Sequence, residues 1–176
     1  MRVIKAYPAR NPDLWQSQSQ SLAQILVNSV DLGAAIGFMQ PLDMAAALAF
    51  WQGTVADSVS KGERDLFIAE EDGAVLGTVQ LILDMPANQP HRAEIAKMMV
   101  APTARRRGVG RALMQAALNA AKANGKTLVT LDTRTSDVAA PLYAAVGFEV
   151  AGHIPDYAFD PDGQARHSTT YMYCKL

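Results

Sequence analysis

Apolar residues recur along the chain at two spacings, one helical and one extended. Four segments repeat them every three or four residues, which predicts helices over residues 14–30, 44–60, 108–124 and 137–146. Asn11-Pro12-Asp13 and Pro41-Leu42-Asp43 precede the first two segments, and such residues commonly begin helices. Shorter segments that alternate or are rich in β-branched residues predict strands over residues 2–7, 65–70, 74–83, 92–100, 127–133, 149–154 and 168–176.

The predicted order is a strand, two helices, three strands, a helix, a strand, a helix and two strands. Glu71-Asp72-Gly73 predicts a hairpin turn, and the polar segment 156–167 is expected to be a long connection. No repeat, low-complexity stretch or linker divides the chain. We therefore predict a single domain over residues 1–176 with a mixed α/β fold.

Composition narrows the class of protein. The chain has 176 residues, 49% hydrophobic and 19% charged, which is typical of a folded domain rather than a disordered one. Its 16 basic and 17 acidic residues give a net charge of −1, so we do not expect a nucleic-acid partner. The longest apolar run, Met44–Trp51, is too short to span a membrane, and the N-terminus lacks the apolar core of a signal peptide. We expect a cytoplasmic protein without a membrane partner.

Cysteine and histidine usage gives no metal signature. The single cysteine, Cys174, excludes an internal disulfide framework and is expected to be a small core residue. His91, His153 and His167 share no ligand spacing, so no metal site is predicted.

The segment Arg105–Arg111, RRRGVGR, lies between a predicted strand and a predicted helix. A helix N-terminus presents unpaired N–H groups with a partial positive charge, and glycines let an anion approach them. Four arginines add charge, so the segment predicts a diphosphate cradle, and the simpler alternative is a solvated basic helix start. The Gly-Lys-Ser/Thr of a Walker loop is absent. A dinucleotide-binding protein is a weaker alternative, because Leu113 replaces the third glycine although Asp132 follows at a suitable distance.

These residues resemble those of the GNAT superfamily of N-acetyltransferases. Arg105, Gly108 and Gly110 match its coenzyme-A signature Gln/Arg-x-x-Gly-x-Gly/Ala, and the segment 142–148 matches its Leu-Tyr-x-x-x-Gly-Phe motif. The resemblance implies a central twisted mixed sheet of about six to seven strands with helices on both faces. It also implies acetyl-CoA as co-substrate and acetyl transfer to an amine by direct attack in a ternary complex. A non-catalytic acyl-CoA sensor on the same fold is the main alternative.

Other segments resemble the tabtoxin-resistance type within that superfamily. They are Arg92-Ala93-Glu94, Leu131-Asp132-Thr133, and Ile154-Pro155-Asp156-Tyr157 with Pro161-Asp162-Gly163. That type acetylates the free amine of a β-lactam amino-acid toxin, which implies a small-molecule amine as the acceptor and a role in antibiotic resistance. The chain is expected to act as a monomer or homodimer.

Two carboxylates are candidates for preparing the acceptor amine. A free alkylamine has a pKa of about 10 and arrives as ammonium, which an acid attracts and deprotonates. Glu94 and Asp132 begin and end neighbouring strands in the implied fold, so both are predicted to bind substrate and act in catalysis. The alternatives are pairing of Glu94 with Arg92, and a cap or a pairing with Arg134 for Asp132. We favour Asp132, because an acid amid Leu128, Val129 and Leu131 is costly without a purpose.

Further roles follow from the resemblance. Tyr143 is implied as the acid that protonates the thiolate, and half-buried packing is its alternative. The oxyanion is expected to bind a backbone N–H of Met99 or Val100. Ser136 stands where many members have asparagine, and Pro141 removes a backbone donor near Tyr143.

The predicted coenzyme-binding residues combine the end of one strand, the glycine turn and the short helix that follows. They are Met98, Met99, Val100, Arg105, Arg106, Arg107, Gly108, Val109, Gly110, Arg111, Ser136 and Tyr143. Phe38 is predicted to line the acceptor pocket, because it lies in the connection between the first two helices. Trp51 is expected in the core, and the connection 156–167 is a candidate second wall.

Overall fold

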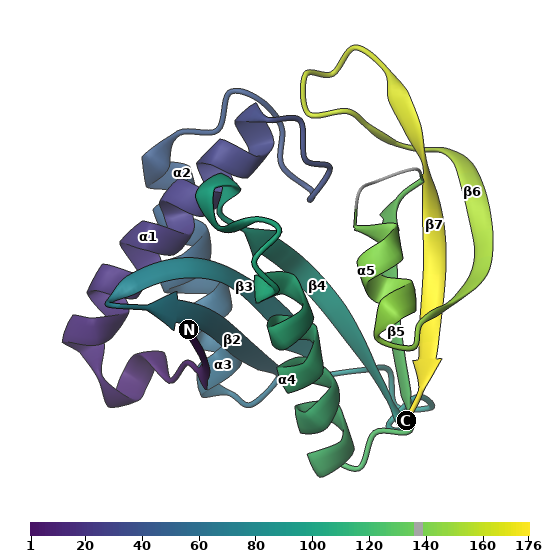
Figure 1. Cartoon of the computed structure of the whole chain (residues 1–176), viewed down its shortest axis with the longest axis horizontal. Helices are drawn as coiled ribbons and strands as arrows, with labels where there is room; N and C mark the ends of the chain where they lie inside the picture. Colours follow the sequence, from purple (N-terminus) through teal and green to yellow (C-terminus); the bar gives the residue numbers. More distant parts are fainter. Residues whose placement is uncertain (136–138) are drawn as a thin grey trace.

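Seven strands form one sheet in the order β1-β2-β3-β4-β5-β7-β6, which confirms the predicted mixed sheet (Figure 1). The computed structural model describes residues 1–135 and 139–176. The strands are β1 (Arg2–Lys5), β2 (Arg64–Glu71), β3 (Ala74–Ile82), β4 (Arg92–Val100), β5 (Leu128–Arg134), β6 (Glu149–Phe159) and β7 (Arg166–Lys175). Only β4 and β5 pair in parallel, and every other neighbouring pair is antiparallel.

Helices α1, α2 and α4 begin within two residues of their predicted starts, whereas α5 begins at Ala140 and the start predicted at 137 lies outside the described residues. They are α1 (Pro12–Asp31), α2 (Met44–Ala49), α3 (Ala56–Ser60), α4 (Val109–Ala123) and α5 (Ala140–Ala145). Asn11 Oδ1 accepts from Leu14 N at 3.1 Å and Asp43 Oδ1 from Ala46 N at 2.7 Å, so each caps the first turn of its helix. A π-helical stretch, Phe50–Val55, joins α2 to α3, and the predicted helix over 44–60 is thus continuous but locally widened. No helix among the described residues is long and apolar enough to cross a membrane.

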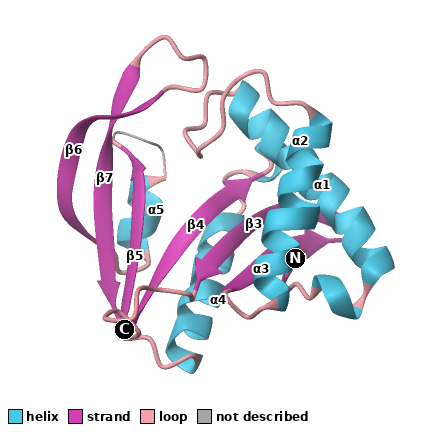
Figure 2. Ribbon diagram, turned by 180° about the vertical axis from the view of Figure 1, so that it is seen from behind, coloured by secondary structure: helices cyan, strands magenta, loops and turns pink. Residues whose placement is uncertain are grey.

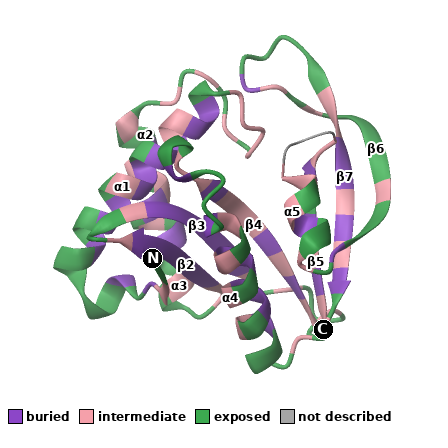
Figure 3. Ribbon diagram, viewed as in Figure 1, coloured by how far each residue is buried: buried purple, intermediate pink, exposed green. Residues whose placement is uncertain are grey.

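Helices cover both faces of the sheet (Figure 2). One core lies between the sheet and α1–α3 and contains Leu66 and Ile68, and the other lies on the α4 side and contains Phe67 and Val79. This division follows the alternation of side chains along a strand. Buried positions concentrate in the middle strands, whereas β6 is largely exposed (Figure 3). Trp51 is fully buried in the first core, as predicted.

The last two strands are longer than predicted. β6 continues to Phe159 and β7 begins at Arg166, so the connection expected over 156–167 is only residues 160–165. The pairing register of β6 shifts between Ile154 and Ala158, around Pro155. Proline is tolerated on an edge strand and at a bulge, because no ladder partner needs its missing N–H. The predicted strand ends at residue 154 because Pro155 follows, but an edge strand can include a proline.

β4 and β5 remain paired for only three residues. The register runs from Arg92 opposite Leu128 to Glu94 opposite Thr130 and then stops, although both strands continue. On its other side β4 carries a bulge, since two residues lie between Ala96 and Met99 where β3 has one. Lys97 in this bulge has φ +50°. Because a bulge bends its strand, it accounts for the divergence of β4 from β5.

Gly77 allows the close approach of β3 to the end of β4. A Cβ at Gly77 would lie 2.5 Å from Met99 O and 3.2 Å from Val100 Cα. We expect Gly77→Ala to lower the free energy of unfolding by about 1–3 kcal/mol, because the backbone must shift to accept the methyl group. Urea denaturation measures this change. The control is Gly152→Ala on β6, where a Cβ meets nothing within 4 Å. Equal stability of the two variants would show that β3 and β4 are not held this closely.

Candidate functional site

The N-terminus of α4 has no side-chain cap among the described residues. The helix is preceded by Gly108 in the left-handed conformation, with φ +80°, and Arg106 has φ +63°. Ala112 N donates the first helical hydrogen bond, to Gly108 O at 3.1 Å. The three preceding amides, at Val109, Gly110 and Arg111, have no partner within the helix and give this end a partial positive charge. An anion fits this arrangement.

The four arginines of the turn differ in their partners. Arg107 forms an ion pair with Glu71, which also lies 3.1 Å from the amino terminus. The hydrogen bond from the amino terminus, and next that from Arg107, lower the pKa of Glu71. In the described parts of the chain, Arg105, Arg106 and Arg111 are exposed and form no ion pair. Arg107 therefore differs from the other three arginines, because Glu71 already pairs with its charge.

Gly110 brings the turn close to α5. A Cβ at Gly110 would lie 2.9 Å from Leu142 Cδ2, and 3.8 Å from both Met98 Cε and Val100 Cγ2. The glycine turn, the end of β4 and the Leu-Tyr motif on α5 therefore meet at one point. Sequence reasoning assigned Gly110 to anion access alone, but the residue also sets helix packing.

Glu94 and Asp132 lie on the same face of the sheet. Thr130 is opposite Glu94 in the register, and Asp132 is two residues further along β5, so all three side chains share a face. Glu94 is 43% exposed and pairs with Arg92, with Nη1 to Oε2 at 3.0 Å, as one alternative predicted. Asp132 Oδ2 accepts from Thr169 Oγ1 at 3.0 Å. This face is uncovered over β5, because the α1–α3 layer covers only the first strands (Figure 2).

The burial argument for Asp132 is wrong. Its side chain is exposed, because the apolar Val129 and Leu131 point to the opposite face of β5. The pairing with Arg134 is also absent, since Arg134 lies 3.1 Å from Asp160 instead. Within the described residues Asp132 forms no ion pair, and its carboxylate is available on the open face.

Tyr143 lies in the core on the α4 side and is 6% exposed. Its ring centroid is 6.2 Å from that of Phe148. Pro141 is the second residue of α5, where a missing N–H costs nothing, so the helix start is not disrupted. Ser136, the other predicted contact in this region, lies outside the described residues.

The backbone of β4 presents an amide to the gap between β4 and β5. Ala101 N donates to Leu76 O of β3 at 2.8 Å. Successive amides of an extended chain point to opposite edges, so the N–H of Val100 points away from β3. Of the two predicted oxyanion donors, Met99 and Val100, this direction favours Val100.

Lys97 is a residue that the sequence analysis missed. Its Nζ lies 5.9 Å from the centroid of Phe38 in the connection between α1 and α2, and a Cβ on Gly37 would lie 3.7 Å from it. Burial, and next repulsion by Arg64, lower the pKa of Lys97, while the charges of Asp132 and Glu94 oppose this shift. Lys97 therefore lies against Phe38 and within the electrostatic influence of both acids. The sequence signal that could have identified this residue is a single lysine inside the otherwise apolar segment Ile95–Val100.

The connection between α1 and α2 contacts the hairpin between β6 and β7. Gln40 N donates to Pro161 O at 2.8 Å. A cavity of about 350 Å³ lies there. It is lined by Asp31, Leu32, Gly33, Gln40, Arg134, Asp160, Pro161 and Asp162. Three residues of the hairpin, Asp160, Pro161 and Asp162, form one wall of this cavity, and the role of the hairpin as a wall of the acceptor pocket stays a prediction.

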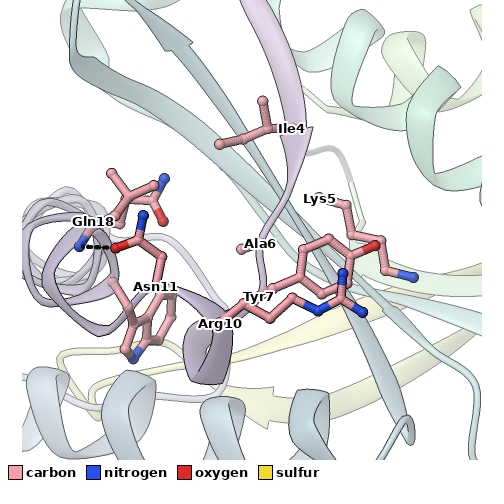
Figure 4. Close-up of a pocket in the computed structure, with 9 residues that line it drawn as sticks. Ile4, Lys5, Ala6, Tyr7, Arg10, Asn11 and Gln18 are labelled. Carbon is pink, nitrogen blue, oxygen red and sulfur yellow. Dashed lines mark hydrogen bonds between the residues drawn. The ribbon is translucent and has the colours of Figure 1, made fainter.

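A second cavity is separate from this site. It has a volume of about 150 Å³ and lies between β1 and the start of α1, where the Tyr7 ring contacts Lys5 at 5.6 Å and Arg10 at 4.3 Å (Figure 4). No predicted site residue lines it, and ligand pockets usually exceed about 300 Å³. We do not assign it to the functional site. No group of three metal-ligating side chains occurs among the residues that the structure describes.

Comparisons with known proteins agree with this geometry. A sequence model of the acetyltransferase (GNAT) family matches residues 34–148. An uncharacterised N-acetyltransferase of Azospirillum brasilense is 31% identical over 109 residues, which cover 61% of this chain and 62% of that protein.

Solved structures show the same fold. A GCN5-related N-acetyltransferase from Kribbella flavida matches with TM-score 0.78 and 25% identity, over 99% of this chain and 97% of that one. A phosphinothricin acetyltransferase from Sinorhizobium meliloti, in complex with acetyl-CoA, matches with TM-score 0.76 and 21% identity, over 99% and 88%.

Tyr171 is the residue of β7 opposite Asp132. Its hydroxyl is 2.9 Å from that of Tyr157. The hydrogen bond with Tyr157 is the largest cause that raises the pKa of Tyr171 to about 12. We expect Tyr157→Phe to lower this pKa toward 10.0, because the protonated phenol loses its acceptor. Nuclear magnetic resonance of labelled tyrosine rings measures it, in the alkaline range where circular dichroism shows the chain folded. Tyr173→Phe is the control, and an unmoved Tyr171 transition in Tyr157→Phe would contradict the pairing.

Proposed function

The chain belongs to the acetyltransferase (GNAT) family, and we propose that it transfers an acetyl group from acetyl-CoA to the primary amine of a small molecule. The observation that carries this proposal is the divergence of β4 from β5 beside the uncapped α4 N-terminus, with two acids on the open face. Acetyl-CoA in the Sinorhizobium meliloti relative supports the choice of co-substrate. The tabtoxin-resistance resemblance supports an amino-acid-like or toxin amine.

The turn before α4 fits a diphosphate. The amides of Val109–Arg111 would donate to phosphate oxygens, and Arg105, Arg106 and Arg111 would supply charge. Gly108 has no Cβ to obstruct this approach and adopts a backbone conformation that favours glycine. Arg107 would contribute less, because Glu71 already holds it.

Acetyl-CoA, when bound, supplies an activated acyl carbonyl and a thiolate leaving group. The gap between the strands would admit the thioester, where the N–H of Val100 would stabilise the developing oxyanion. Tyr143 is our candidate for protonating the departing sulfur. A phenol has a pKa of about 10, close enough to that of a thiol for this transfer.

We assign the two acids different roles. Asp132 is exposed, accepts a hydrogen bond from Thr169 and carries a charge that no described cation pairs, so we propose it as the base. Glu94 shares its charge with Arg92 and would attract and orient the ammonium. Direct attack then needs only one proton removed from the amine before the carbon–nitrogen bond forms.

The first experiment tests coenzyme binding. We expect the double variant Arg106→Gln, Arg111→Gln to weaken acetyl-CoA binding about tenfold, because it removes charge-assisted contacts to phosphate. Isothermal titration calorimetry measures the affinity. Lys122→Gln, at the other end of α4, removes a charge from the same helix and should keep the affinity. Unchanged binding in a folded double variant would refute the cradle.

The second experiment tests the acids with a panel of small primary amines, read by thiol release. We expect Asp132→Asn to lower kcat by about 10² to 10⁴ at neutral pH and to recover as pH rises, because solution then deprotonates the amine. Glu94→Gln should raise KM without changing the pH profile. Bound acetyl-CoA without thiol release by the wild type would instead favour a non-catalytic acyl-CoA module. Wild-type kcat/KM in both amide variants would remove the acids from catalysis.

A further inference from the structure

Three polar side chains outside the proposed reaction gather on neighbouring strands under the α1–α2 connection. Arg64 lies on β2, Gln80 on β3 and Lys97 on β4. Gln80 is fully buried, and its Oε1 accepts from Arg64 Nη1. Arginine has only donors, so this bond fixes the amide orientation and leaves Gln80 Nε2 as a donor. Gln80 Nε2 and Arg64 Nε are buried without a hydrogen-bond partner among the described residues.

Lys97 adds a second cation beside Arg64. The two charges are close enough for repulsion by Arg64 to be the second cause, after burial, that lowers the pKa of Lys97. In the described chain the Lys97 ammonium forms neither an ion pair nor a hydrogen bond, and it contacts only the Phe38 ring as a cation partner. Two half-buried cations and unpaired buried donors are costly together unless an anion or water satisfies them.

Among the described residues no acid forms an ion pair with Arg64 or Lys97, although the nearby charge of Glu63 acts to raise the pKa of Arg64. Glu94 gives its closest contact to Arg92 at 3.0 Å, and Asp132 takes its hydrogen bond from Thr169 at 3.0 Å. Both acids nevertheless act on Lys97, because their charges oppose the lowering of its pKa. The site therefore combines two cations, Arg64 and Lys97, with two acids, Glu94 and Asp132.

We propose that Lys97, with Arg64 as a second positive charge near it, binds a carboxylate of the acceptor while Asp132 takes its amine, so that the acceptor is a zwitterion. This inference rests on the proposed function and names its substrate class. The acceptor would bridge β4 and β5 where the two strands have diverged, with its amine at Asp132 and its carboxylate at Lys97. An ammonium group with three donors matches the two oxygens of a carboxylate. Lys97 and Arg64 are thus residues that determine specificity.

The test compares amino acids with their carboxamides, which keep the amine and lose the anion. We expect the wild type to prefer β-alanine over β-alaninamide and glycine over glycinamide in kcat/KM. Lys97→Met should reduce each preference by about ten- to hundredfold, mainly through KM, because it removes a charged hydrogen-bond donor. An amino acid and its carboxamide differ in the basicity of the amine. The ratio of their kcat/KM values is therefore compared between the wild type and the variant, because the difference in basicity is the same in both.

Two further variants separate charge from structure. Lys97→Arg keeps the charge and should retain most of the preference, and Lys61→Met, an exposed lysine after α3, should keep all of it. Equal preference in the wild type and Lys97→Met would overturn the inference while leaving acetyl transfer in place. The proposed function fails separately, when no amine in the panel releases thiol.

A binding measurement tests the inference without turnover. N-acetyl-β-alanine carries the carboxylate but no free amine. We expect calorimetry to detect its binding to the wild type and a loss of at least tenfold in Lys97→Met. N-acetyl-β-alaninamide is the matched control and should bind weakly to both. If the wild type bound no carboxylate, water would be the partner of the Lys97 ammonium, and the inference would be wrong.

Discussion

The short pairing of β4 with β5 is the constraint on which the rest of the site depends. Parallel strands that stayed paired along their length would leave no gap between β4 and β5 for a thioester. The bulge at Lys97 bends β4 away, and Gly77 lets β3 follow the bent backbone closely. A single irregularity thus opens the gap and turns a lysine toward the acceptor face. The turn before α4 follows the end of the same strand, so β4 positions both the proposed coenzyme-binding turn and the proposed acceptor site.

Local patterns predicted much of this fold. The periodicity of α4 and the alternation of β5 were sufficient, because each element buries one face against a core. The extent of β6 was not predictable, because an edge strand has little burial to mark its residues and accepts Pro155. The divergence of β4 from β5 is not visible in any local pattern of the sequence. It depends on a bulge whose single sign in the sequence is a lysine among apolar residues.

The candidate site divides in the same way. The glycine turn and the Leu-Tyr motif are contiguous in sequence, so their residues were predictable, although their contact through Gly110 and Leu142 was not. Asp132 was chosen for its apolar neighbours, yet two of them, Val129 and Leu131, point to the opposite face. Arg64, Gln80 and Lys97 come from three strands. Only the pairing of those strands brings the residues together, and no local pattern contains that information.

The hydrogen bond from Gln40 N to Pro161 O has a consequence for the size of the acceptor. It joins the α1–α2 connection to the β6–β7 hairpin, at the end of the molecule toward which β4 and β5 diverge (Figure 1). The chain therefore makes a frame around the acceptor face, with the connection on one side and the hairpin on the other. Such a frame would select acceptor molecules by their width. On the proposed function, we expect a slender molecule or a chain end to reach the strands more readily than the broad surface of a folded protein.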